Sequence, residues 1–367
     1  MLGKTNSRFK TSKEDLINTL NEMGIGSSGT KYYWIYLEYK GRYYISDECG
    51  IFYLEESSED IMRKYLIQLY HDTDGDNWTR NDNWCSEEPL EEWYGVTKGK
   101  NGLYSVLLNY NKLNGKIDFQ GCKALYSFRY AGNNNKISDI NLRDCANLVD
   151  VEIGVASNDE LLHKIDISNC VNLKQISGLG NDSLAYFIAS NCTSLKEVHF
   201  YRSYRTSYLT IDLTGCTALE KVSSTAGYIK SIIFKGATNL RELECTYARL
   251  TNLDLSSCVN LVDLDCSNNN LRTLDLSNCR LLESLNCEHN ELTDLVIENC
   301  YNLVDFFCTD NKITKQVPES LRNVKMCLMD FRYNYGWNND GTLTWYDNGV
   351  GWWYPGEPES GVHGWPD

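Results

Sequence analysis

A leucine recurs every 21 residues through the second half of the chain, at Leu219, Leu240, Leu261, Leu282 and Leu303. Each leucine opens the same phrase, seen best in "LVDLDCSNNNLRTLDLSNC", in which apolar and polar residues alternate in two short runs. Alternation with a period of two predicts β-strands, so each repeat has two short strands joined by polar turns. One such unit cannot bury its apolar side alone, and the repeats must therefore stack and share a single core.

The phrase continues upstream with looser spacing as far as "LYSVLLNYNKLNGKI", which begins at Leu103. The pattern L-x-x-L-x-L-x-x-N-x-L is matched by Leu261, Leu264, Cys266, Asn269 and Leu271, and on these residues the chain resembles the leucine-rich repeat family. The resemblance covers residues 103–317. It implies a β-rich, curved leucine-rich repeat solenoid of about ten coils, each of roughly 21–25 residues.

Twelve of the 15 cysteines fall into two repeat columns. The first column is Cys122, Cys145, Cys170, Cys192, Cys216, Cys258, Cys279 and Cys300, with Ala237 in its one gap, and the second is Cys245, Cys266, Cys287 and Cys308. A position that accepts Cys or Ala favours a small apolar side chain pointing inward. Zinc ligation and disulfide bonding are the alternatives, but the chain has no C-x-x-C pair, and side chains in a column point the same way. Asn269, Asn290 and Asn311 form a further column, which we expect to satisfy backbone groups at a turn.

The segment 59–102 is expected to cap the first coil. An amphipathic helix is predicted from the apolar spacing of Ile61, Tyr65, Leu66, Leu69 and Tyr70. Beyond it, the spacing of Trp78, Trp84, Trp93, Gly95 and Val96 resembles the N-terminal cap of plant receptor-kinase-type leucine-rich repeat proteins. Plant caps carry a paired cysteine where this chain has Lys98, so the resemblance implies no cap disulfide for Cys85.

The cap contains "DTDGDNW", whose Asp72, Asp74 and Asp76 have the alternate spacing of a calcium-binding loop. An EF-hand loop also needs Gly at its sixth position and Glu at its twelfth, where this chain has Asn77 and Asn83. We therefore expect a turn between the helix and the tryptophans rather than a metal site, and no cofactor is predicted.

Five of the nine tryptophans lie in the C-terminal segment 318–367. Because a solenoid exposes apolar surface at its last coil, a closing strand with an aromatic cap over that coil is one interpretation. The alternative is a glycan-binding module that uses Trp352 and Trp353 as an aromatic platform.

Residues 1–58 belong to neither cap nor repeats and are expected to form a small α+β unit. Ser12 and Asp15 form a capping box ahead of a short helix that ends near Gly24, and a β-hairpin is predicted around Lys40-Gly41. The intervening "GIGSSG" fits a phosphate-binding pattern, but a helix precedes it and a strand follows, which is the reverse of the order that nucleotide binding requires.

The composition excludes several classes of function. A net charge of −15, from 35 basic and 50 acidic residues, argues against nucleic acid as a partner. No run approaches the roughly 20 apolar residues of a membrane span, and "MLGKTNSRFK" lacks the apolar run of a signal peptide, so the chain is expected to be cytosolic as written or a mature fragment. The motifs G-x-S-x-G and H-E-x-x-H are absent, and no enzymatic activity is predicted.

The function is predicted to be binding through the residues that alternate with the core positions. If Leu264 and Cys266 point inward, then Asp263, Asp265 and Ser267 point outward. Applied to every repeat, this register exposes a column of variable residues, which favours a protein or peptide as the partner. The C-terminal half of the column is acidic, so the partner can be a basic one. An irregular insert from His199 to Tyr208 adds aromatic and arginine side chains. The candidate contact residues are Arg129, His199, Tyr201, Arg202, Tyr204, Glu244, Asp265 and Phe307. The chain is also similar to secreted or surface-anchored bacterial leucine-rich repeat proteins, which implies a secreted or cell-surface, adhesin-like role.

Overall fold

The computed structural model describes residues 57–131, 135–154, 161–180, 183–201, 208–225 and 227–313, and the backbones of short strands within 37–54 and 327–353. The chain forms two compact units, Met1–Arg63 and Lys64–Asp367. In the first unit, strands β1 (Leu37–Tyr39) and β2 (Arg42–Ser46) pair antiparallel, which confirms the predicted hairpin. A third strand, β3 (Phe52–Leu54), joins them. The predicted helix near Ser12 lies outside the described residues.

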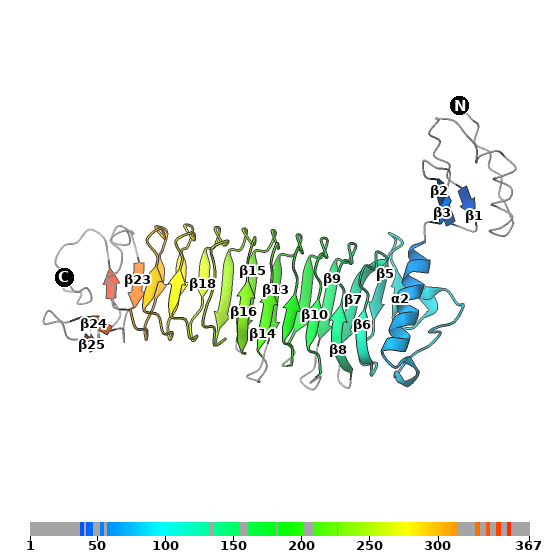
Figure 1. Ribbon diagram of the computed structural model, residues 1–367, viewed down its shortest axis with the longest axis horizontal. Coiled ribbons are helices and arrows are strands. Elements are labelled where there is room, and N and C mark those ends of the chain that lie inside the picture. The colour runs from blue at the N-terminus through cyan, green and yellow to red at the C-terminus, as the bar shows by residue number, and fades with distance from the viewer. Residues whose placement is uncertain are drawn as a thin grey trace, which may run out of the picture. The chain divides into compact units, whose positions relative to one another are not determined.

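The second unit is a leucine-rich repeat solenoid, as predicted, whose coils stand side by side in one row (Figure 1). Its long sheet has 13 strands in spatial order of the coils, and all neighbours from β5 to β23 run parallel. After β4 (Val96–Lys98), which is antiparallel to β5, the ten strands of the coils are β5 (Tyr104–Leu107), β7 (Leu125–Ala131), β9 (Asp150–Gly154), β11 (Gln175–Leu179), β13 (Glu197–Tyr201), β15 (Lys221–Thr225), β17 (Glu242–Thr246), β18 (Asp263–Asp265), β20 (Ser284–Asn286) and β22 (Asp305–Phe307).

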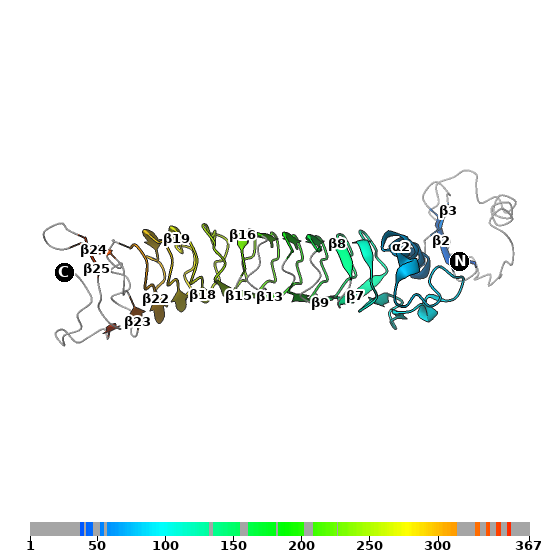
Figure 2. The ribbon, with the colours of Figure 1, turned by 90° about the horizontal axis from the view of Figure 1, so that it is seen from below.

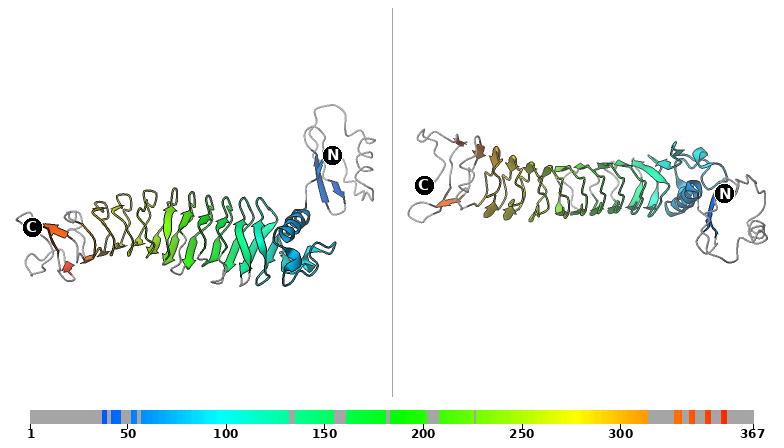
Figure 3. Two further views of the ribbon diagram at one scale, coloured as in Figure 1. Left: turned by 60° about the horizontal axis from the view of Figure 1, so that its bottom comes forward. Right: turned by 90° about the horizontal axis from the view of Figure 1, so that it is seen from above.

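The second run of alternating residues in each repeat forms the opposite side of the coil, as Figure 2 shows from below. A six-stranded parallel sheet contains β6 (Asn114–Asp118), β8 (Lys136–Asn141), β10 (Lys164–Asp166), β12 (Tyr186–Ile188), β14 (Leu209–Asp212) and β16 (Ile229–Ile233). Farther along the row, β19 (Thr273–Asp275) pairs with β21 (Asp294–Val296). The prediction of two strand-forming runs per repeat is thus confirmed for these coils, whose stacking is also visible from two further directions in Figure 3.

The core lies between the two sides of the coil and contains both cysteine columns. Leu264 and Cys266 are fully buried, and the twelve cysteines of the two columns are likewise inaccessible. In the first column the thiols donate to carbonyl oxygens of the preceding coil, as Cys145 Sγ does to Phe119 O at 3.0 Å and Cys170 Sγ to Leu142 O at 3.0 Å. Burial raises the pKa of the Cys122 thiol to about 11, so these sulfurs stay protonated and behave as small core side chains.

Asparagine side chains complete the backbone hydrogen bonding at the turns that follow strands β18, β20 and β22. Asn269 Nδ2 donates to Cys245 O at 2.7 Å and to Cys266 O at 2.9 Å, while its Oδ1 accepts from Leu250 N at 2.9 Å. Asn290 and Asn311 repeat this pattern one and two coils farther on. The structural role predicted for this column is confirmed.

The N-terminal cap begins with helix α2 (Ser58–Asp72), followed by the 3₁₀ turns η1 (Gly75–Asn77) and η2 (Leu90–Glu92). Its three tryptophans are buried and contact one another, with Trp84 lying 4.7 Å from Trp78 and 5.4 Å from Trp93 between ring centroids. Gly95 has φ 79°, and a Cβ there would lie 2.2 Å from Leu107 O, so only glycine allows the cap to join the first coil this closely.

The three aspartates of the calcium-like motif are engaged with different partners. Asp72 accepts from Gln68, Asp74 accepts from Asn77, and Asp76 accepts from Tyr70 Oη at 2.7 Å. The segment therefore forms a turn held by side-chain hydrogen bonds.

Beyond the last coil the chain contributes four short strands. Strand β23 (Cys327–Asp330) pairs parallel with β22, and β26 (Gly351–Trp353) pairs antiparallel with β23. The hairpin of β24 (Tyr335–Trp337) and β25 (Leu343–Trp345) is separate. The predicted closing strand is present, whereas the tryptophan side chains of this segment lie outside the described residues.

Candidate recognition face

The side chains that point outward from the long sheet form the face predicted to bind a partner, which we call the recognition face. Strand register aligns His199, Ser223, Glu244, Asp265, Asn286 and Phe307 in one row across six consecutive strands. Leu107, Arg129, Glu152 and Ser177 form the same row over the first four strands, and a register shift in β11 separates the two parts. All ten residues are partly or fully exposed.

The prediction of the face is wrong for one residue, Ser267. Ser267 was expected to point outward beside Asp265, but it is only 6% exposed. The strand ends at Asp265, and the chain then turns through Asn268, which has φ 57°. Alternation holds only within extended backbone, so Ser267 is folded into the turn, where its N–H donates to Asp265 Oδ1 at 2.9 Å.

The predicted insert between His199 and Tyr208 is wrong at its start, because residues 199–201 continue strand β13. His199 lies on the face, with Nδ1 2.7 Å from Ser223 Oγ and Nε2 3.1 Å from Glu197 Oε2. Arg202 and Tyr204 lie outside the described residues, as do the side chains of Tyr201, Trp352 and Trp353.

The C-terminal half of the recognition face is acidic. The outward positions of β17, β18 and β22 carry Glu242, Glu244, Asp263, Asp265 and Asp305. Lys221 on β15 forms an ion pair with Glu242. Within the described residues, no Lys, Arg or His lies within 4 Å of the other four carboxylates, which leaves this surface with excess negative charge.

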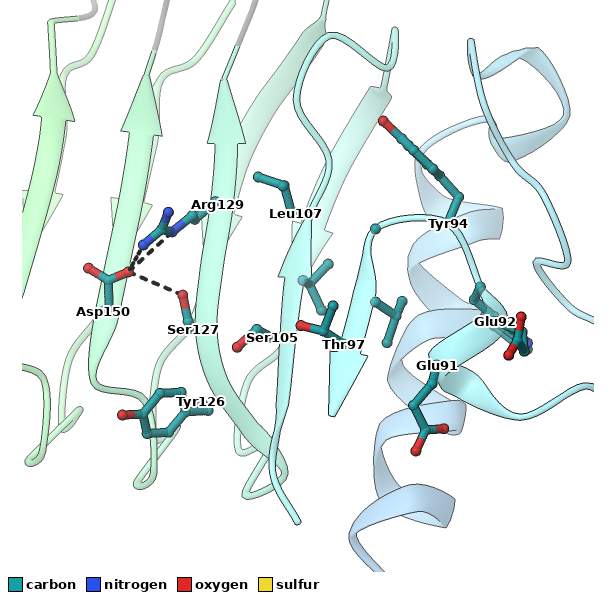
Figure 4. A pocket seen from close by; sticks show the side chains of 14 residues that line it. Glu91, Glu92, Tyr94, Thr97, Ser105, Leu107, Tyr126, Ser127, Arg129 and Asp150 are labelled. Atoms are coloured by element: carbon teal, nitrogen blue, oxygen red, sulfur yellow. Dashed lines mark hydrogen bonds and ion pairs between the residues drawn. The ribbon is translucent and has the colours of Figure 1, made fainter. Parts of the chain in front are cut away.

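The N-terminal end of the face contains a groove of about 590 Å³ between the cap and the first strands (Figure 4). Its lining combines exposed apolar side chains, chiefly Leu107 at 45% and Tyr126 at 38%, with the hydroxyl groups of Thr97, Ser105 and Ser127. The cap closes one side through residues 91–95. This groove could not be predicted from the sequence, because it forms only where the cap lies beside β5.

Arg129, a predicted contact residue, lines the groove but is already paired. Its Nη2 lies 3.0 Å from Asp150 Oδ2, which also accepts from Ser127 Oγ at 3.2 Å (Figure 4). Its Nε lies 3.8 Å from Glu152 Oε2. The arginine is consequently held in place by its two carboxylates and is not an open anion site. The groove thus combines exposed apolar side chains with hydroxyl groups and a paired arginine, a mixture that is common in protein interfaces.

The described residues contain no group of three His, Cys, Asp or Glu side chains that could hold a metal ion. Across the same residues, no helix has the length and apolar character needed to cross a membrane. What the face offers chemically is therefore charge, hydroxyl groups and a small apolar groove.

Comparison with known proteins gives likeness of fold only. No protein-family model matches the sequence, and no curated protein does. Among solved structures, the functional domain of InlJ from Listeria monocytogenes, described as including a cysteine ladder, is 19% identical over 62% of this chain and 53% of that domain, with a TM-score of 0.42. An internalin, InlF, from the same organism is 16% identical over 77% of this chain and 91% of its own, with a TM-score of 0.33. A leucine-rich repeat protein from Bacteroides eggerthii is 12% identical over 76% and 62%, with a TM-score of 0.39. The assignment of the leucine-rich repeat fold rests on the coils themselves.

Proposed function

We propose that the protein is a non-enzymatic recognition module that binds a basic protein or peptide through the recognition face. One observation carries the proposal: Glu244 lies directly opposite Asp265 on the neighbouring parallel strand, with Asp263 on the strand of Asp265 and Asp305 two strands farther on. None of these four carboxylates has a cationic partner within 4 Å among the described residues. Like charges this close raise the free energy of the unbound fold, and a basic partner would relieve that repulsion. Phe307, half-buried at the end of the row, adds an apolar contact beside the charges.

The proposal is tested with a random peptide display library selected on the immobilised full chain. We expect selected peptides rich in Lys and Arg, with affinities that fall as salt is raised. The double variant Glu244→Lys with Asp265→Lys should weaken their binding about tenfold or more.

The matched control is Glu87→Lys with Glu298→Lys, which changes the net charge equally at two exposed positions away from the face. Equal losses in the two double variants would show a general charge effect, and no loss in the first variant would refute the assignment of the face.

We further propose a secreted or cell-surface location, supported by the resemblance of the repeats to bacterial surface proteins of this class. An antibody against the chain should label intact cells of the source organism. Labelling that requires permeabilised cells would contradict this location.

A further inference from the structure

Two tyrosines and an arginine from three successive coils are stacked at the turn that leads from the long sheet to the second sheet. Leu209 N donates to Tyr228 O at 2.8 Å, and Ile229 N donates to Ala248 O at 2.9 Å, which brings the three coils into register. The rings of Tyr208 and Tyr228 lie 5.5 Å apart at 28°, and the Arg249 guanidinium carbon lies 4.0 Å from the centre of the Tyr228 ring.

This stack is exposed although most of its side-chain area is apolar. Tyr208 is 59% exposed, and Tyr247, two residues before Arg249 in the same turn, is 54% exposed. Stacking already restricts the rotamers of Tyr228 and Arg249, so a partner that contacts them would lose little further side-chain entropy. Tyrosine and arginine are also the residue types most enriched among the energetically dominant contacts of protein interfaces.

The backbone beneath the cluster is strained. Tyr247 has φ 53° and Arg249 has φ 55°, in the left-handed region that disfavours side chains of this size. At the aligned turn of the next three coils the left-handed residues are Asn268, His289 and Asp310, types that tolerate this conformation better. On the other edge of the coils the left-handed positions are all Gly, Asn or Asp, namely Gly121, Asp144, Asn169, Asn191, Gly215 and Gly236.

The tyrosine at position 247 therefore costs stability that an asparagine would recover. Only one other coil shows the same pair among the described residues: Tyr110 has φ 55° and Lys112 has φ 59°. Exposed side chains kept at the expense of the fold are best explained by contacts with another molecule.

We propose that Tyr208, Tyr228, Tyr247 and Arg249, the tyrosine cluster, form a second contact site, which takes an acidic protein segment bearing an apolar side chain. The proposal rests on the proposed function in that the ligand is a protein. Within the described part of the chain, no carboxylate lies within 4 Å of Arg249, so the cluster is a cationic spot on a molecule of net charge −15. An acidic segment complements it, and exposed tyrosine rings suit an apolar neighbour.

The test uses the same full chain and peptide library. We expect a class of peptides that combine Asp or Glu with an apolar residue, and Tyr247→Asn should weaken their binding about tenfold. Relief of the backbone strain should at the same time move the urea midpoint of this variant to a higher concentration. Tyr301→Asn is the control: it removes a tyrosine ring that is 59% exposed and has no left-handed backbone, and it should leave peptide binding unchanged and the urea midpoint without this gain.

The proposals for the recognition face and for the tyrosine cluster can be refuted independently. Acidic peptides should bind the Glu244→Lys, Asp265→Lys variant as well as they bind the wild-type chain, whereas basic peptides should not. The cluster proposal is overturned if Tyr247→Asn binds every selected peptide like the wild-type chain, or if the variant is less stable. It is also overturned if a glycan array shows oligosaccharide binding that Tyr247→Asn abolishes while peptide binding persists.

Discussion

One coil upstream of the second cysteine column, the same strand position holds a serine instead of a cysteine. Ser224 pairs in register with Cys245, the first cysteine of that column, and is fully buried. Its hydroxyl oxygen has no hydrogen-bond partner among the described residues. A buried hydroxyl group has lost its hydrogen bonds to water, and here no protein group in the described part of the chain replaces them. Ser224 therefore lowers the stability of the coil in which it lies.

The cost can be estimated from the group that is left unsatisfied. Burial of a hydroxyl without a partner costs about 1–3 kcal/mol, so Ser224→Ala should stabilise the solenoid by an amount at the lower end of that range. The lower end applies because alanine removes the hydroxyl but leaves a small cavity. Ser224→Cys should gain more, since sulfur fills the space as it does at Cys245 and forms only weak hydrogen bonds.

Urea unfolding followed by circular dichroism measures both variants, with amide exchange in strand β15 as the local readout. The control is Ser223→Ala on the same strand. The hydroxyl of Ser223 lies 2.7 Å from His199 Nδ1, so it has a hydrogen-bond partner and its removal should not stabilise the fold. We expect the urea midpoint to rise in both Ser224 variants and to stay unchanged in the control. A lower midpoint for Ser224→Ala would refute the reasoning, because it would mean that the hydroxyl contributes to stability.

Leu281→Asn should raise the urea midpoint, because the aligned Asn260 donates to Thr238 O at 3.0 Å, whereas Leu281 is 41% exposed without such a bond. Leu264→Asp should unfold the neighbouring coils by burying an unpaired charge, and wild-type melting would contradict the register. Among the described cysteines, iodoacetamide should alkylate only the exposed Cys85 in the native chain, as read by mass spectrometry, and faster at alkaline pH because burial and Asp76 raise the pKa of this thiol. The N–H of Ser277 lowers the pKa of Asp275, so this carboxylate stabilises the fold above the usual Asp pKa of about 3.9 and ceases to do so as pH falls. Asp275→Asn should therefore flatten the acid limb of a pH–stability curve.

The core of the solenoid could be predicted from the sequence because two periods agree. The 21-residue repeat places Leu264 and its counterparts, such as Leu243, at the same point of their coils. The period of two assigns this position to the interior. Small, inward-facing cysteines follow from the same two facts, since a column of equal side chains must pack at the spacing of the coils.

The turns could not be predicted in this way, because alternation gives no information where the chain leaves the strand. Ser267 was misplaced for that reason. The left-handed conformation of Tyr247 and Arg249 has no sequence signal at all, since Gly or Asn would be the expected residue there. The groove depends on the cap lying beside β5, and the pairing of Arg129 with Asp150 depends on the register between β7 and β9.

Departures from a column differ in meaning according to where the side chain points. Ser224 weakens its coil and is buried, so no other molecule can benefit from its hydroxyl. Tyr247 strains its coil and is exposed, so its ring is available to a partner. In a repeat fold, where each position is compared with its own copies, an exposed residue that costs stability therefore indicates function more strongly than exposure alone. The same criterion separates the tyrosine cluster from Tyr301, which is 59% exposed but has no left-handed backbone.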